Sequence, residues 1–117
     1  MIDKNKIRIS DYICERLIKC GLSKTFMITG GGSMHLNDAL TRSRIIDVHF
    51  LHHEQSLSMA AEGFSRVTGK PAIVNVTTGP GVINTLNGVY GAFVDSVPMF
   101  VISGQVKTET IAYLKNR

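Results

Sequence analysis

The stretch AIVNVTTGPG, residues 72–81, decides the fold because a mainly apolar run ends there in a turn-forming sequence. Such a run followed by glycine and proline is typical of a buried strand that leaves the sheet in a tight turn. The stretch TFMITGGGS, residues 25–33, has the same pattern earlier in the chain. Both stretches therefore predict a strand followed by a turn.

The same alternation continues on either side of these two stretches. Ser10 and Gly21 suit the N-cap and the C-cap of a helix that precedes the first strand. The predicted helices are residues 11–20, 33–40, 54–67 and 82–94, and the predicted strands are residues 25–29, 46–51, 72–77 and 99–103. Strands joined through helices pair in parallel, with helices on both sheet faces. The sequence therefore predicts an α/β fold with an open, mostly parallel sheet and Rossmann-like layers.

Length and composition restrict the chain to one globular domain. Its 117 residues are 44% hydrophobic and 19% charged, a balance that supports one buried core. Six of the 13 Lys and Arg residues fall in residues 1–24, and the central part is nearly neutral. Nucleic-acid binders instead concentrate Lys and Arg along one surface, with aromatic residues between them. Nucleic acid is therefore not an expected partner.

Neither a redox pair nor a membrane segment is predicted. Cys14 and Cys20 lie six residues apart in one predicted helix, which turns them to different sides. The chain has no apolar run of about 18 residues and no charged-then-apolar leader. We expect a cytoplasmic protein with no membrane partner.

Ligand-binding residues are expected at the carboxyl ends of the predicted strands, where open α/β sheets bind their ligands. Two of these ends hold glycine clusters, and neither matches a nucleotide-binding motif. In the first, a G-x-G-x-x-G alignment places His35 at the third glycine, where helix packing needs a small residue. In the second, Pro80 removes one of the N–H groups that a phosphate would use. A rigid turn presenting Thr77 and Asn84 suits a flat, hydrogen-bonding ligand, although a plain tight turn explains it as well.

The segment around Glu54 is the third candidate. His52 and His53 point to opposite faces if they continue a strand, so a metal site is disfavoured. Glu54 falls where strand gives way to helix, at the carboxyl edge of the sheet. A carboxylate there either stabilises the helix N-terminus or faces a ligand.

Taken in order, these segments resemble the N-terminal, pyrimidine-binding domain of thiamine-diphosphate-dependent enzymes, in the acetolactate synthase and pyruvate oxidase group. Four stretches carry the resemblance, and together they cover nearly the whole chain. They are residues 31–40, residues 53–69, residues 78–84, and residues 95–98 leading into 103–106.

The resemblance implies that the complete protein binds thiamine diphosphate across a subunit interface. Glu54 matches the family's catalytic glutamate, which hydrogen-bonds N1′ of the aminopyrimidine ring and so activates the cofactor. The positions that match cofactor-binding residues are Ile28, Gly31, Glu54, Thr77, Pro80 and Asn84. Gly32 and His35 are the candidates for substrate contacts.

Two departures from the family bear on what the chain does alone. It contains no GDG motif, which begins the family's diphosphate and metal site, so Mg²⁺ would be bound by a domain outside these residues. We therefore expect residues 1–117 to be the N-terminal domain of a longer enzyme, or to work with a second polypeptide, and to be inactive alone. Residues 107–115 differ from acetolactate synthases, which favours another 2-keto acid or a sugar or polyol derivative as substrate.

The expected function is that of a thiamine-diphosphate-dependent transferase or lyase, acetolactate-synthase-like, which makes or breaks a carbon–carbon bond next to a carbonyl. The expected assembly is a homodimer or tetramer that acts on a small-molecule substrate. FAD stays open as a second cofactor, with no motif in the chain supporting it. The alternative is a non-catalytic binding or oligomerisation module of the same fold.

Overall fold

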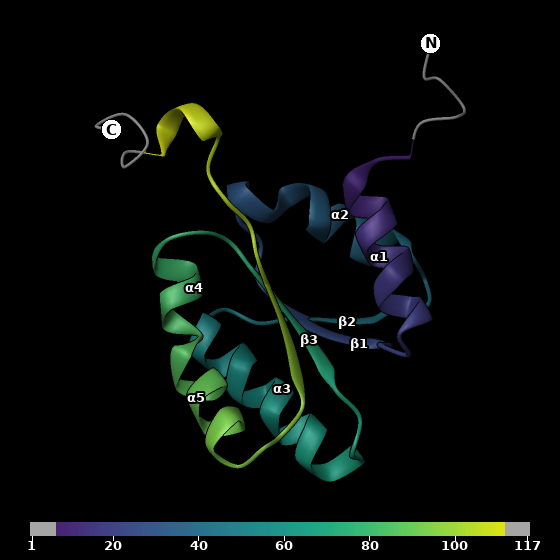
Figure 1. Cartoon of the computed structure of the whole chain (residues 1–117), viewed down its shortest axis with the longest axis vertical. Coiled ribbons are helices and arrows are strands. Elements are labelled where there is room, and N and C mark those ends of the chain that lie inside the picture. Colours follow the sequence, from purple (N-terminus) through teal and green to yellow (C-terminus); the bar gives the residue numbers. More distant parts are fainter. Residues whose placement is uncertain (1–6, 112–117) are drawn as a thin grey trace.

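The computed structural model describes residues 7–111 and contains a four-stranded sheet. Neighbouring strands are all parallel, in the order β2-β1-β3-β4 (Figure 1). The strands are β1 (Lys24–Met27), β2 (Asp47–Phe50), β3 (Ala72–Val76) and β4 (Met99–Ser103). The predicted open, parallel α/β sheet is confirmed.

Helices cover both faces of the sheet, as predicted. They are α1 (Ile9–Lys19), α2 (Met34–Arg42), α3 (Glu54–Thr68), α4 (Pro80–Asn84) and α5 (Leu86–Val94), with short 3₁₀ turns at Gly31–Ser33 and Thr108–Thr110. Figure 1 shows α1 and α2 on one side of the strands and α3, α4 and α5 on the other. No helix within residues 7–111 is long and apolar enough to cross a membrane.

Two apolar cores, one on each face, hold the three layers together. Successive residues of a strand point to opposite faces, so Ile73 joins the core under α1 and α2, whereas Val74 joins the core under α3. Every residue of β3 is buried, because this strand is central and covered on both faces. The loops at its carboxyl end are therefore mounted on the most enclosed strand of the sheet.

The segment predicted as one helix over residues 82–94 is divided into α4 and α5, so that prediction was wrong. The Thr85 hydroxyl, between the two helices, donates to the carbonyl of Val82 at 2.6 Å, and the N–H of Thr85 bonds the same carbonyl at 3.2 Å. A side chain that competes for a backbone carbonyl interrupts the regular helical ladder. In addition, Pro80 begins α4 earlier than predicted, because the first turn of a helix needs no N–H donor there.

The first helix also begins earlier than predicted. Its N-cap is Arg8, and Ser10 is buried within the first turn, so the prediction of Ser10 as N-cap was wrong. The Arg8 guanidinium pairs with the carboxylate of Asp11 at 2.9 Å, which fixes the start of the helix. The C-cap is Cys20 and not the predicted Gly21. Gly21 comes next, with a φ of +82°, because glycine adopts this left-handed conformation without strain.

The two cysteines point to different sides, as predicted, since one is buried and the other exposed. Cys14 is buried against α2, and its Sγ donates to the carbonyl of Ala39 at 3.6 Å. Burial raises the pKa of the Cys14 thiol. Cys20 is exposed, and both thiols are free.

The chain changes direction between β1 and β3. After β1 it turns to α2 on one face of the sheet, and after β3 it turns to α4 and α5 on the other face (Figure 1). Neighbouring parallel strands whose following helices lie on opposite faces leave a crevice between their loops, where open α/β sheets bind ligands. The crevice expected here lies between residues 28–33 and residues 77–79.

Candidate functional site

Thr77, the first residue after β3, connects the loops at the carboxyl edge of the sheet. The N–H of Gly32 donates to Thr77 Oγ1 at 3.2 Å. A Cβ on Gly30 would lie 2.5 Å from Thr77 Cβ, and one on Gly81 would lie 2.8 Å from Thr77 Cγ2. Carbon atoms do not approach this closely, so both positions require glycine. The two glycine clusters of the sequence therefore let two loops close around one threonine.

The loop after β4 packs against the same place. A Cβ on Gly104 would overlap the carbonyl group of Gly32, so the two backbones touch directly. Beside them, the Thr78 hydroxyl donates to Gln105 Oε1 at 3.0 Å, and the N–H of Val106 donates to the same oxygen at 2.8 Å. The loops after β1, β3 and β4 are thus fixed relative to one another by close backbone approach.

Glu54 is held at one oxygen and free at the other. It begins α3 and is half-buried. The amide Nδ2 of Asn84, at the end of α4, donates to Glu54 Oε2 at 3.3 Å. The other oxygen, Oε1, would lie 3.3 Å from a Cβ on Gly81, and it has no hydrogen-bond partner within residues 7–111. The carboxylate therefore presents one oxygen beside bare glycine backbone.

His53, the residue before Glu54, caps helix α3. Its Nδ1 accepts from the N–H of Gln55 at 3.2 Å. The helix terminus thus has a side-chain cap without the Glu54 carboxylate. In the part of the chain that the structure describes, no three His, Cys, Asp or Glu side chains gather as metal ligands.

An open cavity of about 430 Å³ lies at the beginning of α2. The residues that line it are Thr29, Gly30, Gly31, Met34 and Asn37. Gly31 is exposed, and a Cβ there would meet nothing within 4 Å. A small ligand can therefore reach the backbone at the end of β1.

Three further predicted site residues, Ile28, Pro80 and His35, lie in three different surroundings. Ile28 follows β1 and packs against the core under α3, and Pro80 is exposed in the first turn of α4. His35 is exposed and lines a different cavity, of about 430 Å³, which it shares with Arg8 and Ile9 of the α1 segment. The structure therefore gathers the predicted cofactor-binding residues at one edge and leaves His35 apart from them.

Two buried asparagines near the site were not predicted. Asn75 lies within β3 and is fully buried, and its Nδ2 donates to Oδ1 of Asn37 on α2. Asn37 in turn lines the cavity at Gly31. A signal was present in the sequence, because Asn75 is the single polar residue of the run AIVNV.

Comparison with known proteins gives matches over most of the chain. Residues 7–116 match the family model described as thiamine pyrophosphate enzyme, N-terminal TPP binding domain. The chain is 41% identical over 102 residues to acetolactate synthase 1, chloroplastic, of Oryza sativa subsp. japonica, which covers 87% of this chain and 16% of that protein. It is 43% identical over 102 residues to acetolactate synthase 2, chloroplastic, of Nicotiana tabacum, covering 87% and 15%.

A bacterial relative is similar to the same degree. The acetolactate synthase large subunit of Buchnera aphidicola subsp. Acyrthosiphon pisum (strain APS) is 39% identical over 104 residues, which are 89% of this chain and 18% of that protein. The chain spans less than a fifth of the length of these curated relatives.

Proposed function

This chain belongs to the thiamine pyrophosphate enzyme family, as its N-terminal TPP-binding domain, and on that premise we propose that the carboxyl edge of its sheet holds the aminopyrimidine ring of thiamine diphosphate. Glu54 is proposed to contact N1′ of the ring and to be the catalytic residue. Asn84, Thr77, Pro80 and the backbone at Gly31 are proposed to line the ring.

One observation carries this proposal, namely the free oxygen of Glu54. Asn84 fixes the carboxylate from one side, and His53 caps the helix, so Glu54 Oε1 is available to a ligand. Gly81 places no side chain in front of that oxygen. A flat heteroaromatic ring with a protonatable nitrogen fits such a position, because it needs a carboxylate partner and close approach to backbone.

The chemistry follows from which atoms this chain supplies. When bound, thiamine diphosphate would supply a C–H group of raised acidity, at C2 of the thiazolium ring, whose deprotonated carbon is the nucleophile toward a carbonyl group. Glu54 would share a proton between Oε1 and N1′, and a positioned acid or base contributes about 10²- to 10⁴-fold to a rate. Asn84 would keep the carboxylate in the orientation that this proton transfer needs.

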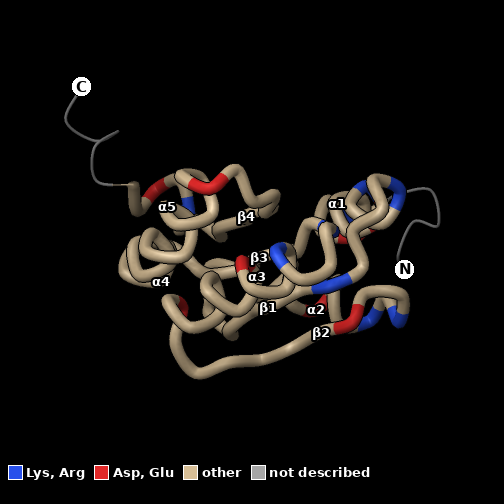
Figure 2. The backbone as a smooth tube through the Cα atoms, turned by 90° about the horizontal axis from the view of Figure 1, so that it is seen from below, with Lys and Arg blue, Asp and Glu red and all other residues tan. Residues whose placement is uncertain are grey.

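We also propose that the complete protein is at least a homodimer, with the outer surface of α4 and α5 in the contact. Residues 80–94 carry no charged side chain, and Figure 2 shows most Lys and Arg positions on the side of α1, α2 and β2. This α4–α5 surface exposes the apolar side chains of Ile83, Leu86, Tyr90, Phe93 and Val94. Contiguous exposed apolar surfaces of this kind mark interaction sites. A partner seated there would also cover the edge at Asn84.

For the complete protein we propose an acetolactate-synthase-like activity, the making or breaking of a carbon–carbon bond next to a carbonyl of a 2-keto acid or related substrate. The named relatives are acetolactate synthases, which supports this class of reaction. The diphosphate and Mg²⁺ are assigned to a domain outside residues 1–117, and a cytoplasmic location is proposed. FAD has no support among the residues of this chain.

Calorimetric titration of the complete protein with thiamine diphosphate and Mg²⁺ tests the proposed site. We expect Asn84→Leu to weaken binding about tenfold, because the hydrogen bond that orients a charged carboxylate is lost. Thr41→Leu is the control, since Thr41 is exposed on α2, away from the α4–α5 surface, and its side chain makes no hydrogen bond within residues 7–111. Equal effects of the two variants would contradict the site.

The same titration distinguishes the proposed enzyme from a non-catalytic module of the same fold. A module kept for oligomerisation would associate through its α4–α5 surface and would release no heat with thiamine diphosphate. Saturable binding that depends on Asn84 would favour the enzyme.

A further inference from the structure

The buried asparagine pair is the least expected feature of the core. Asn75 lies on β3 and Asn37 lies on α2, 38 residues earlier in the sequence. Asn75 Nδ2 donates to Asn37 Oδ1. Asn75 also places its Nδ2 at 3.7 Å from the sulfur of Met27. Its own carbonyl oxygen, Oδ1, is the buried side-chain atom without a hydrogen-bond partner in the described residues.

Such a pair lowers stability compared with apolar side chains of similar size. A buried carbonyl that loses its water partner without gaining another costs free energy, so an unpaired buried group calls for a reason. Packing gives none here, because the neighbours of Asn75 along β3 are apolar and fully buried. The remaining polar contact of Asn75 within the described residues that can explain the pair is the one with Asn37.

Asn75 determines the orientation of the Asn37 amide. Because Asn37 Oδ1 accepts from Asn75, its Nδ2 must point the other way. Within residues 7–111 Asn37 Nδ2 donates to no atom. Unlike Asn75 Oδ1, it is not a fully buried atom without a partner, so it keeps some exposure. Asn37 is 8% exposed and lines the cavity at Gly31, so this N–H group is available there.

The residues that line the cavity restrict the chemical class of ligand that it can bind. They include no Lys, Arg or His side chain that could pair with a carboxylate or a phosphate. The cavity holds about 430 Å³, enough for a small molecule, and Met34 and the glycines give it apolar walls. An oriented N–H donor in such walls selects an uncharged oxygen acceptor, such as the carbonyl oxygen of an aldehyde or ketone.

We propose that this cavity is a subsite for an uncharged carbonyl group of the substrate, bound by Asn37 Nδ2. Asn75 is a positioning residue, which acts by holding the Asn37 amide in one orientation. The subsite lies next to the proposed cofactor edge, because Gly30 and Gly32 pack on Thr77 and Gly81 packs on both Thr77 and Glu54. This inference rests on the proposed function, which requires a carbonyl substrate.

Saturation-transfer NMR on the complete protein, with 2-butanone as the uncharged probe and acetate as the charged probe, tests the subsite. We expect saturation of 2-butanone in the natural protein and at least a fivefold loss in Asn37→Asp. The aspartate keeps an acceptor for Asn75 but has no N–H group for the ligand. Acetate is expected to respond equally in both proteins.

Thr41→Asp is the control, because it adds the same charge at an exposed position of α2, the helix that carries Asn37, and lies away from the α4–α5 surface. It is expected to leave the 2-butanone signal unchanged. An unchanged signal in Asn37→Asp, or an equal loss in both variants, would overturn the subsite.

Asn75→Val tests positioning separately from folding. Removal of the unpaired carbonyl is expected to keep or raise the thermal midpoint, while the 2-butanone signal falls severalfold because the Asn37 amide is free to rotate. A fall in the midpoint with an unchanged signal would show a structural role only and would overturn the positioning role.

Calorimetry with thiamine diphosphate keeps the two proposals distinguishable. Asn37→Asp that binds thiamine diphosphate normally but loses 2-butanone supports the subsite. A natural protein that binds no thiamine diphosphate contradicts the proposed function, whereas normal cofactor binding with an unaltered 2-butanone signal in Asn37→Asp contradicts this inference alone.

Discussion

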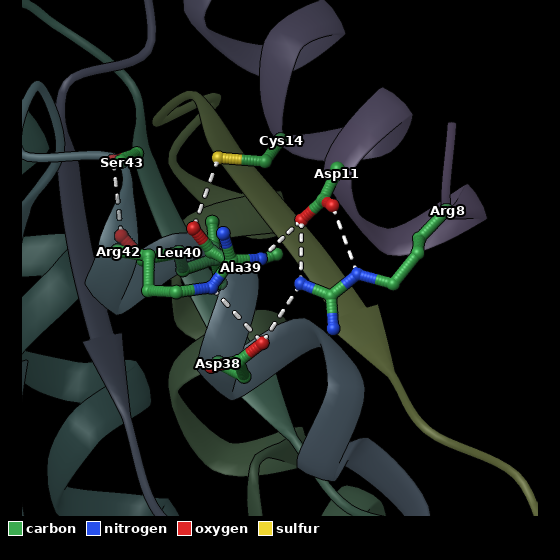
Figure 3. Close-up of polar contacts among 8 residues, drawn as sticks. All are labelled: Arg8, Asp11, Cys14, Asp38, Ala39, Leu40, Arg42 and Ser43. Atoms are coloured by element: carbon green, nitrogen blue, oxygen red, sulfur yellow. Dashed lines mark hydrogen bonds and ion pairs between the residues drawn. The ribbon is translucent and has the colours of Figure 1, made fainter. Parts of the chain in front are cut away.

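The helix pair α1–α2 and the helix pair α3–α5 cover opposite faces of the same sheet, yet they are joined in different ways. Between α1 and α2, Asp11 accepts from Arg8 at 2.9 Å and from Arg42 at 2.6 Å, and Asp38 accepts from both arginines (Figure 3). Between α3 and α5 the helices touch at Gly88, where a Cβ would lie 2.6 Å from the backbone carbon of Ser58. Among the described residues an ion pair joins them only at one end, where Arg66 of α3 contacts Asp95, the C-cap of α5, at 2.5 Å.

The two helix pairs therefore differ in what they present to solvent. The charges between α1 and α2 are paired with one another and face water at little cost. The tight glycine contact between α3 and α5 leaves the apolar side chains of α4 and α5 on the outside, next to Glu54 and Asn84. The face with the candidate site is therefore also the face that favours association.

The largest expected effect comes from a charge on the α4–α5 surface. Phe93 is 80% exposed, and Phe93→Glu should raise the dissociation constant of the oligomer about 10- to 100-fold, since burying a phenylalanine contributes about 1.5–3 kcal/mol. Ile9→Glu on α1 is the control, because Ile9 is 78% exposed. Sedimentation velocity measures both variants, and the comparison fails if Ile9→Glu dissociates the protein as strongly.

The next effect concerns the contact between α3 and α5. Gly88→Ala should destabilise the protein by about 1–3 kcal/mol, because the added methyl group meets helix backbone that cannot move aside. Gly63→Ala, on α3 itself, has nothing within 4 Å of the new Cβ and should stabilise by about 0.5–1 kcal/mol. Urea unfolding of both proteins gives the two values. A similar loss in both variants would show that helix propensity, and not close approach, is measured.

The smallest effect is expected in the charge network of α1 and α2. Asp11→Ala should destabilise by about 0.5–1 kcal/mol, because its partners stay exposed and water replaces the lost ion pairs. The loss should shrink in 1 M salt, where charges are screened within about 3 Å. Urea unfolding at low and high salt measures this. A loss that does not depend on salt would mean that Asp11 acts by packing instead.

Much of the fold and the position of the candidate site could be predicted from local sequence. Strand runs ending in glycine marked the carboxyl edge, and Glu54 was assigned to it from its position between a strand and a helix. These predictions succeed because apolar runs and glycine turns act over a few residues. The parallel sheet followed from the alternation of strands and helices alone.

The features that were missed depend on contacts between distant residues. Thr85 divides the predicted helix because its hydroxyl donates to the carbonyl of Val82. The residue type alone does not predict that this hydrogen bond forms. The Asn37–Asn75 pair requires the register of α2 on β3. His35 was assigned to the glycine turn from sequence distance, whereas the direction of α2 carries it to the α1 side.

The most direct test of the central claim is the rate at which C2 of bound thiamine diphosphate exchanges its proton for deuterium in the complete protein. Glu54→Gln keeps the size of the side chain and removes the carboxylate, so we expect the exchange to slow by about 10²- to 10⁴-fold with the fold intact. Glu15→Gln, which removes an exposed carboxylate on α1, should exchange at the natural rate. An unchanged rate in Glu54→Gln would contradict the role of Glu54 in activating the cofactor.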